Sequence, residues 1–186
     1  MMTITSADLI GLGIISNHCD TKKLQIAVNE AVQFDLRNLL GNLFFLVNEN
    51  WDQTSPGIYF DIVEPKNYTN CSGYETTHVG LKKVLAYYSY SRYILINSFN
   101  DTPNGLVEKS NNFSIPKSLD ELQSFSSKYR NMGLEDYRLV EAYILLNSAT
   151  YPSYNTTCAK PCGCNGTCGK KTTNKGFGIR SKTIVK

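Results

Sequence analysis

The sequence predicts a mainly α protein: a helical bundle with a small β-hairpin or protruding loop, followed by an extended C-terminal arm. Apolar residues recur at steps of three and four through several long segments, which is the spacing of a buried helix face. All sixteen acidic residues precede residue 151, whereas seven of the nineteen Lys and Arg follow it. We therefore divide the chain into a helical domain, residues 1–150, and a basic, cysteine-containing arm, residues 151–186.

The charge of the chain is distributed unevenly between these two parts. Residues 1–150 hold twelve Lys and Arg against sixteen Asp and Glu, a net charge of −4, whereas residues 151–186 carry +7. A block of one charge sign beside a folded domain is typical of an interaction arm. The other interpretation is a solvated tail without a partner.

The first long helix is expected to follow Asp20, a good N-cap residue, and to end at Gly41, a good C-terminal stop. Its apolar series consists of Leu24, Val28, Val32, Leu36 and Leu39. The polar stretch 49–76 follows and is a candidate protrusion. Within it, residues 58–63 (IYFDIV) have the composition of a strand.

A second helix is predicted from Thr77 to Asn97, and it is apolar around most of its circumference. Such a helix is buried, either in the centre of a bundle or against another subunit. Its aromatic residues give the predicted oligomer interface, which comprises Tyr87, Tyr88, Tyr90 and Tyr93.

After this helix, residues 102–105 (TPNG) predict a turn. The segments LVEK and NFSI, on either side of Ser110-Asn111, predict a small hairpin. Ser118 and Glu121 form a capping-box pattern that opens the last helix. If this helix continues to Ala149, it is roughly 45 Å long, and Gly133 is expected to kink or split it.

No motif for catalysis is recognisable, and we do not expect an enzyme. The sequence lacks a Gly-rich phosphate loop, HExxH and GxSxG. A Cys/His pair, Cys19 with His78 or Cys71 with His18, is arithmetically possible, but nothing in the sequence around these residues would activate a thiol. No apolar stretch is long enough to span a membrane, and no signal peptide is recognised, so we expect folding in a reducing cytoplasm. Thiols or metal ligands are then expected rather than a disulfide framework.

The arm contains four cysteines within eleven residues: Cys158, Cys162, Cys164 and Cys168. Four thiolates suffice for a tetrahedral zinc site, although zinc fingers separate their ligand pairs more widely. Three interpretations stay open: a compact zinc knuckle, disulfides formed after release from the cell, or small residues in an extended arm. Zinc is therefore a possible cofactor, and no other cofactor is expected.

The rest of the arm is predicted to bind a partner. Its last segment alternates in polarity and could add a strand to another chain's sheet edge. The predicted partner-binding residues are Lys160, Lys170, Lys171, Lys175, Phe177, Arg180, Lys182, Ile184 and Val185.

Three segments resemble the head–tail connector proteins of tailed bacteriophages, in particular the neck ring adaptors of crAss-like and other Bacteroidetes phages. They are the opening helices (DLIGLGIISNHCDTKKLQIAVNEAVQFDLRNLLG), the Tyr-rich helix (VGLKKVLAYYSYSRYI) and, most specifically, TPNGLVEKSNNFS. The resemblance covers roughly residues 5–147. The cysteine-rich insert departs from the simplest members of that family.

The resemblance implies a structural virion protein of the phage neck, assembled in the host cytoplasm. Such a protein forms a homo-oligomeric ring of about twelve copies beneath the portal protein. The ring continues the DNA channel past packaged double-stranded DNA, binds further neck or tail proteins and contacts no membrane. The alternative from another class is a small cytoplasmic regulator that binds zinc or nucleic acid.

Overall fold

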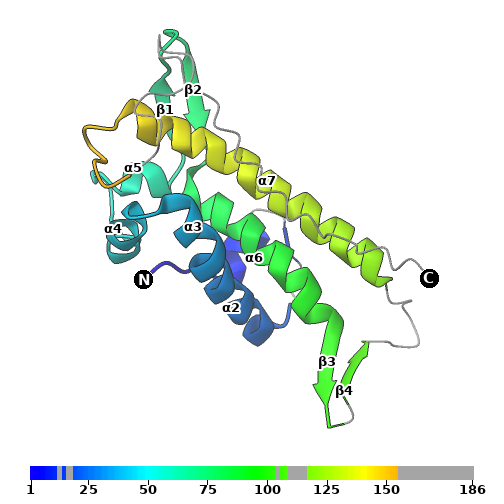
Figure 1. Cartoon of the computed structure of the whole chain (residues 1–186). Helices are drawn as coiled ribbons and strands as arrows, with labels where there is room; N and C mark the ends of the chain where they lie inside the picture. Colours follow the sequence, from blue (N-terminus) through cyan, green and yellow to red (C-terminus); the bar gives the residue numbers. More distant parts are fainter. Residues whose placement is uncertain (12–13, 16–18, 104, 109–116, 155–186) are drawn as a thin grey trace, which may run out of the picture.

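The computed structural model describes residues 1–154 except 12–13, 16–18, 104 and 109–116, and it confirms a mainly α fold. The N-terminal helices and the two long helices α6 and α7 form a bundle, and two short hairpins extend from it (Figure 1). Within the described residues, no helix is long and apolar enough to cross a membrane. The N-terminal elements are α1 (Ser6–Gly11), α2 (Thr21–Glu30), η1 (Ala31–Leu36), α3 (Arg37–Leu40) and α4 (Leu43–Glu49).

The predicted first helix is present as the continuous series α2, η1 and α3. Asp20 caps it as expected, because its side chain accepts hydrogen bonds from the N–H groups of Lys22 and Lys23. Gly41 ends it with φ at +55°, a conformation that favours glycine. The middle turn, η1, is π-helical, and short π segments of this kind frequently lie at functional sites.

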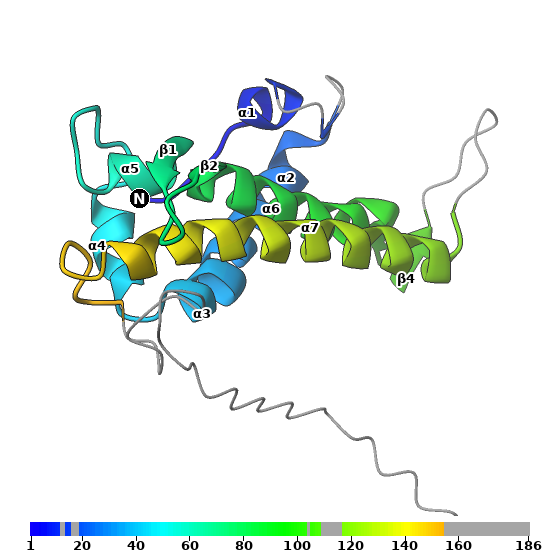
Figure 2. The ribbon, with the colours of Figure 1, turned by 90° about the horizontal axis from the view of Figure 1, so that it is seen from above.

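The two long helices, α6 (Gly80–Ser98) and α7 (Leu119–Leu146), run antiparallel and pack side by side (Figures 1 and 2). The predicted capping box of α7 is confirmed in full: Ser118 and Glu121 bond to each other's backbone N–H. The helix has 28 residues and is therefore about 42 Å long. It continues through Gly133, so the predicted break there was wrong.

The stretch 58–63, which we expected to be a strand, is helical in part. Phe60–Val63 form α5, and two adjacent residues of this helix, Ile62 and Val63, are both buried. A strand alternates its two faces and could not bury two adjacent side chains in one core, which explains why the helix is favoured here. The protrusion itself is confirmed and lies just after α5. It is the hairpin of β1 (Lys66–Thr69) and β2 (Glu75–His78), which extends beyond the end of α7 in Figure 1.

The first segment of the predicted LVEK–NFSI hairpin is a strand, and it pairs with residues that precede it in the chain. Strand β4 (Gly105–Glu108) pairs with β3 (Phe99–Thr102), in a register that places Phe99 opposite Glu108 and Thr102 opposite Gly105. Of the predicted TPNG turn, Thr102 and Gly105 end and begin these strands, and Asn104 lies outside the described residues. The segment NFSI lies outside the described residues.

Helix α6 begins three residues later than predicted, because Thr77 and His78 belong to β2. The reason is Gly80, whose φ of +78° suits the change from strand to helix. A Cβ at this position would lie 2.4 Å from the carbonyl oxygen of Val63. Glycine thus permits the close approach of α5 to the start of α6.

The hydrophobic core lies between the N-terminal helices, α6 and α7, and the chain start is part of it. The Trp51 indole donates to the carbonyl of Thr3, and the Met2 amide donates to Asn48. At the other end, Tyr151 is 3% exposed. The folded part therefore continues at least through Tyr154, beyond the boundary that we predicted between residues 150 and 151.

Candidate interaction surface

The four tyrosines predicted as subunit contacts divide into two pairs. Tyr88 and Tyr93 are buried, at 4% and 6% exposed, inside the chain's own core. They offer almost no surface to another subunit: Tyr88 packs against Gly133 of α7, and the Tyr93 hydroxyl accepts a hydrogen bond from the Asp20 N–H, just before α2. Tyr87 and Tyr90 are half-buried beside α7, where the Tyr90 ring meets the edge of Tyr129 with 4.7 Å between ring centroids. For these two, the predicted subunit contact stays a prediction.

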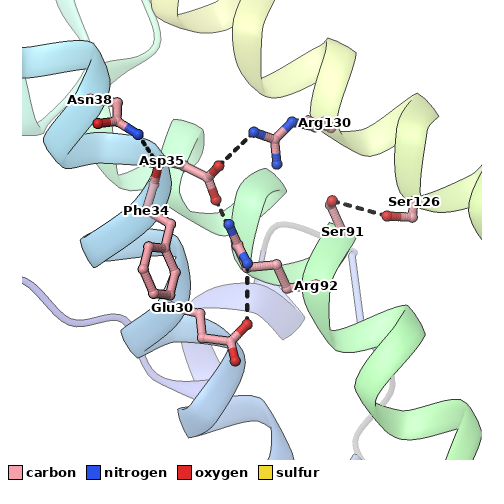
Figure 3. Close-up of polar contacts among 8 residues, drawn as sticks. All are labelled: Glu30, Phe34, Asp35, Asn38, Ser91, Arg92, Ser126 and Arg130. Atoms are coloured by element: carbon pink, nitrogen blue, oxygen red, sulfur yellow. Dashed lines mark hydrogen bonds and ion pairs between the residues drawn. The ribbon is translucent and has the colours of Figure 1, made fainter. Parts of the chain in front are cut away.

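A charged cluster joins η1, α6 and α7 (Figure 3). Asp35, on η1, is 3% exposed and lies between two arginines. Arg92 of α6 donates from Nε to Asp35 Oδ2 at 2.7 Å, and Arg130 of α7 forms an ion pair with Oδ1 at 2.8 Å. Arg92 also bonds to Glu30 at 3.2 Å. Burial of a carboxylate is costly unless the carboxylate is paired with a cation, and here Arg92 and Arg130 both pair with it.

Aromatic rings further restrict the two guanidinium groups. Arg130 lies over the ring of Tyr88, 5.4 Å from its centroid, and Arg92 lies 5.5 Å from the centroid of Phe34. Phe34 is 59% exposed. The cluster thus fixes the position of α7 against η1 and α6, and it brings one exposed aromatic ring to the surface.

The outward side of α7 carries apolar residues at seven-residue intervals, which we call the outer row. Its members are Phe125, Met132, Leu139 and Leu146, and each is between 37% and 48% exposed. Because 3.6 residues make a helical turn, residues seven apart lie nearly in line. The row therefore runs for about 32 Å along the helix. A long row of exposed apolar side chains marks an interaction surface.

Two open grooves flank α7. The Tyr87 groove, of 660 Å³, is more polar and is lined by Tyr87, Ser124, Ser127, Lys128, Asn131, Met132, Glu135 and Asp136. The Tyr90 groove, of 340 Å³, is mostly apolar and is lined by Tyr90, Tyr93, Ile94, Asn97, Leu122, Phe125 and Tyr129. Members of the outer row therefore contribute to both grooves.

The N-terminal helices carry a different exposed feature, the Arg37–Phe45 pair. The guanidinium of Arg37 lies 5.6 Å from the ring centroid of Phe45, which is 54% exposed. Arginine and large aromatic residues are enriched in protein interfaces. This pair and the outer row lie on different helices.

The segment that leads into the arm is anchored to α7. The Tyr154 hydroxyl donates to Glu141 at 2.7 Å, the Tyr137 hydroxyl donates to the carbonyl of Leu39 at 2.6 Å, and the two hydroxyl oxygens lie 2.8 Å apart. The Tyr151 hydroxyl donates to the carbonyl of Ile58 at 2.7 Å. Burial raises the pKa of both Tyr137 and Tyr154, so these hydroxyls stay protonated.

His78 is fully buried between the rings of Tyr68 and Tyr143, and its Nδ1 accepts a hydrogen bond from Gly80. Burial lowers its pKa from 6.5 to about 4, so the ring is neutral near pH 7. Cys71 is disulfide-bonded, which differs from the thiol that we expected. Cys19 is a free thiol. His18 lies outside the described residues.

All the residues predicted for metal and partner binding also lie outside the described part of the chain. They are the cysteines 158, 162, 164 and 168 and the arm residues 160–185. Among the residues that the structure does describe, no three His, Cys, Asp or Glu gather as a metal site.

Sequence reasoning missed Asp35, Arg37, Phe45 and the outer row as surface or site features. The signal for the outer row was present, because Phe125, Met132, Leu139 and Leu146 are spaced by seven. Asp35 was hidden within an apolar helical series. Nothing in the sequence distinguished exposed Phe45 from its buried neighbour Phe44.

These features define a small helical protein whose distinctive surfaces are apolar and aromatic. Comparison with known families matches residues 36–163, which is 128 of the 186 residues, to a family of unknown function, DUF6712. The chain belongs to this family. No curated protein and no solved structure matches it.

Proposed function

We propose that this chain is a structural virion protein that forms a ring in the phage neck, between the portal and the tail. In this role it continues the DNA channel and joins head to tail. The observation that carries the proposal is the outer row of α7, a long apolar surface that no other described residue covers. A subunit of a closed assembly needs such a surface, whereas a monomer gains nothing from exposing it.

The fold supports the same role. Long antiparallel helices fixed by the Asp35 cluster give a rigid body, which a ring needs if the rotation between subunits is to close the circle. Residues 1–150 carry a net charge of −4, which does not favour binding to the phosphate backbone. DNA can therefore slide past.

The basic arm supplies the link to the portal in this proposal. Tyr151 and Tyr154 anchor its first residues to the body, so tension on the arm is transmitted to α7. The arm's positive charge favours an acidic partner surface, and its last segment suits addition to a sheet edge.

The test is co-expression with the portal protein from the same genome. The full chain should co-purify with the portal, whereas a chain ending after Tyr154 should fold and fail to bind. Truncation at this residue keeps the anchoring hydroxyl contacts, so loss of binding would not reflect a damaged body. Mass spectrometry of purified phage particles should find the full chain at a fixed ratio to the portal.

Two results would overturn the proposal. One is absence of the chain from particles. The other is stoichiometric zinc in the reduced protein together with salt-sensitive DNA binding, which would identify the regulator considered above.

A further inference from the structure

We propose that Cys71, at the tip of the β1–β2 hairpin, forms a disulfide with one of the four cysteines of the arm. The bond ties the arm to the hairpin once the protein leaves reducing surroundings. The bond itself is independent of the proposed function, whereas its role in a virus particle rests on that function.

The bonding partner of Cys71 follows from the cysteines of the chain. The sequence has six cysteines, and Cys71 is disulfide-bonded. Within the described residues the other cysteine is Cys19, and it is a free thiol. A bond within the chain therefore joins Cys71 to the arm. The candidates for its partner are Cys158, Cys162, Cys164 and Cys168.

The turn at the tip of the hairpin presents Cys71 to the solvent. Asn70 organises this turn, because its side-chain oxygen accepts hydrogen bonds from the N–H groups of Ser72 and Tyr74, both at 3.0 Å. Its carbonyl accepts a third bond from Gly73, whose φ of +84° favours glycine. Cys71 lies within the turn and is exposed. A second thiol and a soluble oxidant can both reach it.

The base of the hairpin and the residues that lead into the arm meet at Tyr143 of α7. Tyr68 of β1 packs edge-on against the Tyr143 ring, with 5.1 Å between ring centroids. The ring centroid of Tyr151 lies 6.3 Å from that of Tyr143. Hairpin and arm thus start from the same end of α7 (Figure 1). The fold brings together two segments that lie far apart in the sequence.

The chain is long enough to close the bond from these two starting points. Cys71 is three residues from Tyr68, which is about 10 Å along a strand. Cys168 is fourteen residues beyond Tyr154, a length that spans up to about 50 Å when extended. The later arm cysteines therefore reach the hairpin tip without any movement of the helices.

Formation of the bond needs an oxidant, and oxidised glutathione or another small disulfide supplies it. The Cys71 thiolate attacks this disulfide, forms a mixed disulfide and releases one small thiol. A thiolate of the arm then attacks the Cys71 sulfur and releases the second small thiol. The two protein sulfurs are oxidised, the small disulfide is reduced, and the two protein protons end on the released thiols. In a reducing cytoplasm the reverse reaction keeps the arm untied.

The bond makes the attachment of the arm depend on the redox state. During assembly in a reducing cytoplasm, the arm is free to reach its partner. In released particles, which meet oxidising surroundings, the arm is fixed to the hairpin. Three arm cysteines then remain, one fewer than the four thiolates of a closed zinc site. The bond and the four-cysteine zinc knuckle therefore exclude each other.

Peptide mapping tests the bond directly. The full chain is purified under reduction and incubated with oxidised glutathione, and its remaining thiols are blocked before digestion without reductant. Mass spectrometry should find a peptide with Cys71 linked to a peptide of the arm. The matched control Cys19→Ser should give the same linked peptide, and Cys71→Ser should give none. Circular dichroism should show that both variants fold.

The equilibrium with glutathione tests the geometry. In the unfolded chain, the bond closes a loop of almost ninety residues or more. In the folded chain, only the hairpin tip and the first part of the arm remain to be ordered, because Tyr143 already joins their starting points. A shorter loop closes at a lower entropic cost. The ratio of bonded to reduced chain should therefore be at least about tenfold higher in native buffer than in urea.

Three results would overturn the proposed bond. They are a Cys71 peptide linked to Cys19, a yield that rises with protein concentration because the link joins two copies, and equal bonded ratios in native buffer and urea. Particles whose thiols are blocked before analysis test the function separately. If they contain the chain without the linked peptide, the role of the bond in the particle is wrong and the proposed function stands. If the purified chain forms the bond but particles lack the chain, the function is wrong and the bond stands.

Discussion

Gly133 of α7 packs directly against the ring of Tyr88 of α6: a Cβ at position 133 would lie 3.1 Å from Cε2 of that ring and 3.3 Å from the Cβ of Tyr87. Glycine inside a helix costs about 1 kcal/mol relative to alanine. The close approach of the two long helices at this point is what offsets that cost. Tyr88 cannot easily move away, because Arg130 lies over its ring.

The first prediction is that Gly133→Val lowers the free energy of unfolding by about 1–3 kcal/mol, the usual cost of overpacking. The branched side chain would push α7 away from Tyr88. Urea denaturation measures the change, and Gly11→Ala is the control, because nothing lies within 4 Å of a Cβ there. Equal stability of Gly133→Val and wild type would contradict the close packing.

The second prediction concerns the buried carboxylate. Asp35→Ala should lower the free energy of unfolding by about 3 kcal/mol, because Arg92 loses a partner in a partly buried site. We expect the lower end of the usual range, since Arg92 keeps its bond to Glu30 and Arg130 reaches solvent.

Glu135→Ala is the matched control for the second prediction. It removes an exposed carboxylate from an ion pair with Arg138 and should change stability by at most about 1 kcal/mol. If the two substitutions had equal effects, the Asp35 cluster would not hold α7 in place.

The sequence was sufficient for features that depend on local chemistry. The caps at Asp20 and Ser118 and the stop at Gly41 each follow from one residue type at one position, and all three are confirmed. The fold class followed from the helical spacing of apolar residues. These signals need no knowledge of which helices meet.

Features that depend on tertiary packing could not be predicted. Gly133 looked like a helix breaker, because the sequence does not reveal that Tyr88 lies against it. IYFDIV looked like a strand, because a short apolar run is compatible with either element. Tyr88 and Tyr93 looked available for a partner, because the sequence does not reveal that α7 packs on Tyr88 or that the start of α2 contacts Tyr93.

The third prediction is a pH dependence from His78. Its pKa is about 4 in the folded protein against 6.5 when exposed. Between these values the unfolded chain binds a proton that the folded chain does not, so the free energy of unfolding falls as the pH is lowered. The loss should total about 3 kcal/mol from pH 6.5 to pH 4.

Chemical denaturation across this pH range tests the third prediction against His78→Asn. Asparagine cannot take up the proton, and its side-chain oxygen can still accept the hydrogen bond from Gly80. The variant should therefore show a flatter pH profile than wild type. Parallel profiles would exclude His78 as the source of the slope.

The fourth prediction concerns the anchor of the arm. Tyr154→Phe removes the hydroxyl that bonds to Glu141 and Tyr137, and it should lower the free energy of unfolding by about 1–2 kcal/mol. The larger effect should be on the local hydrogen exchange of the segment that Tyr154 anchors. The amides of Tyr151 and Tyr154, which bond to the carbonyls of Asn147 and Tyr151, should exchange hydrogen at least about tenfold faster.

Hydrogen exchange followed by mass spectrometry measures this fourth effect, with Tyr74→Phe as the exposed control. The Tyr137 hydroxyl donates to the carbonyl of Leu39. Removing the Tyr154 hydroxyl therefore leaves this bond in place. The core should therefore stay protected while residues 151–154 open. If their exchange rate did not change, Tyr151 alone would hold the segment, and tension on the arm would reach the body at Ile58 rather than through α7.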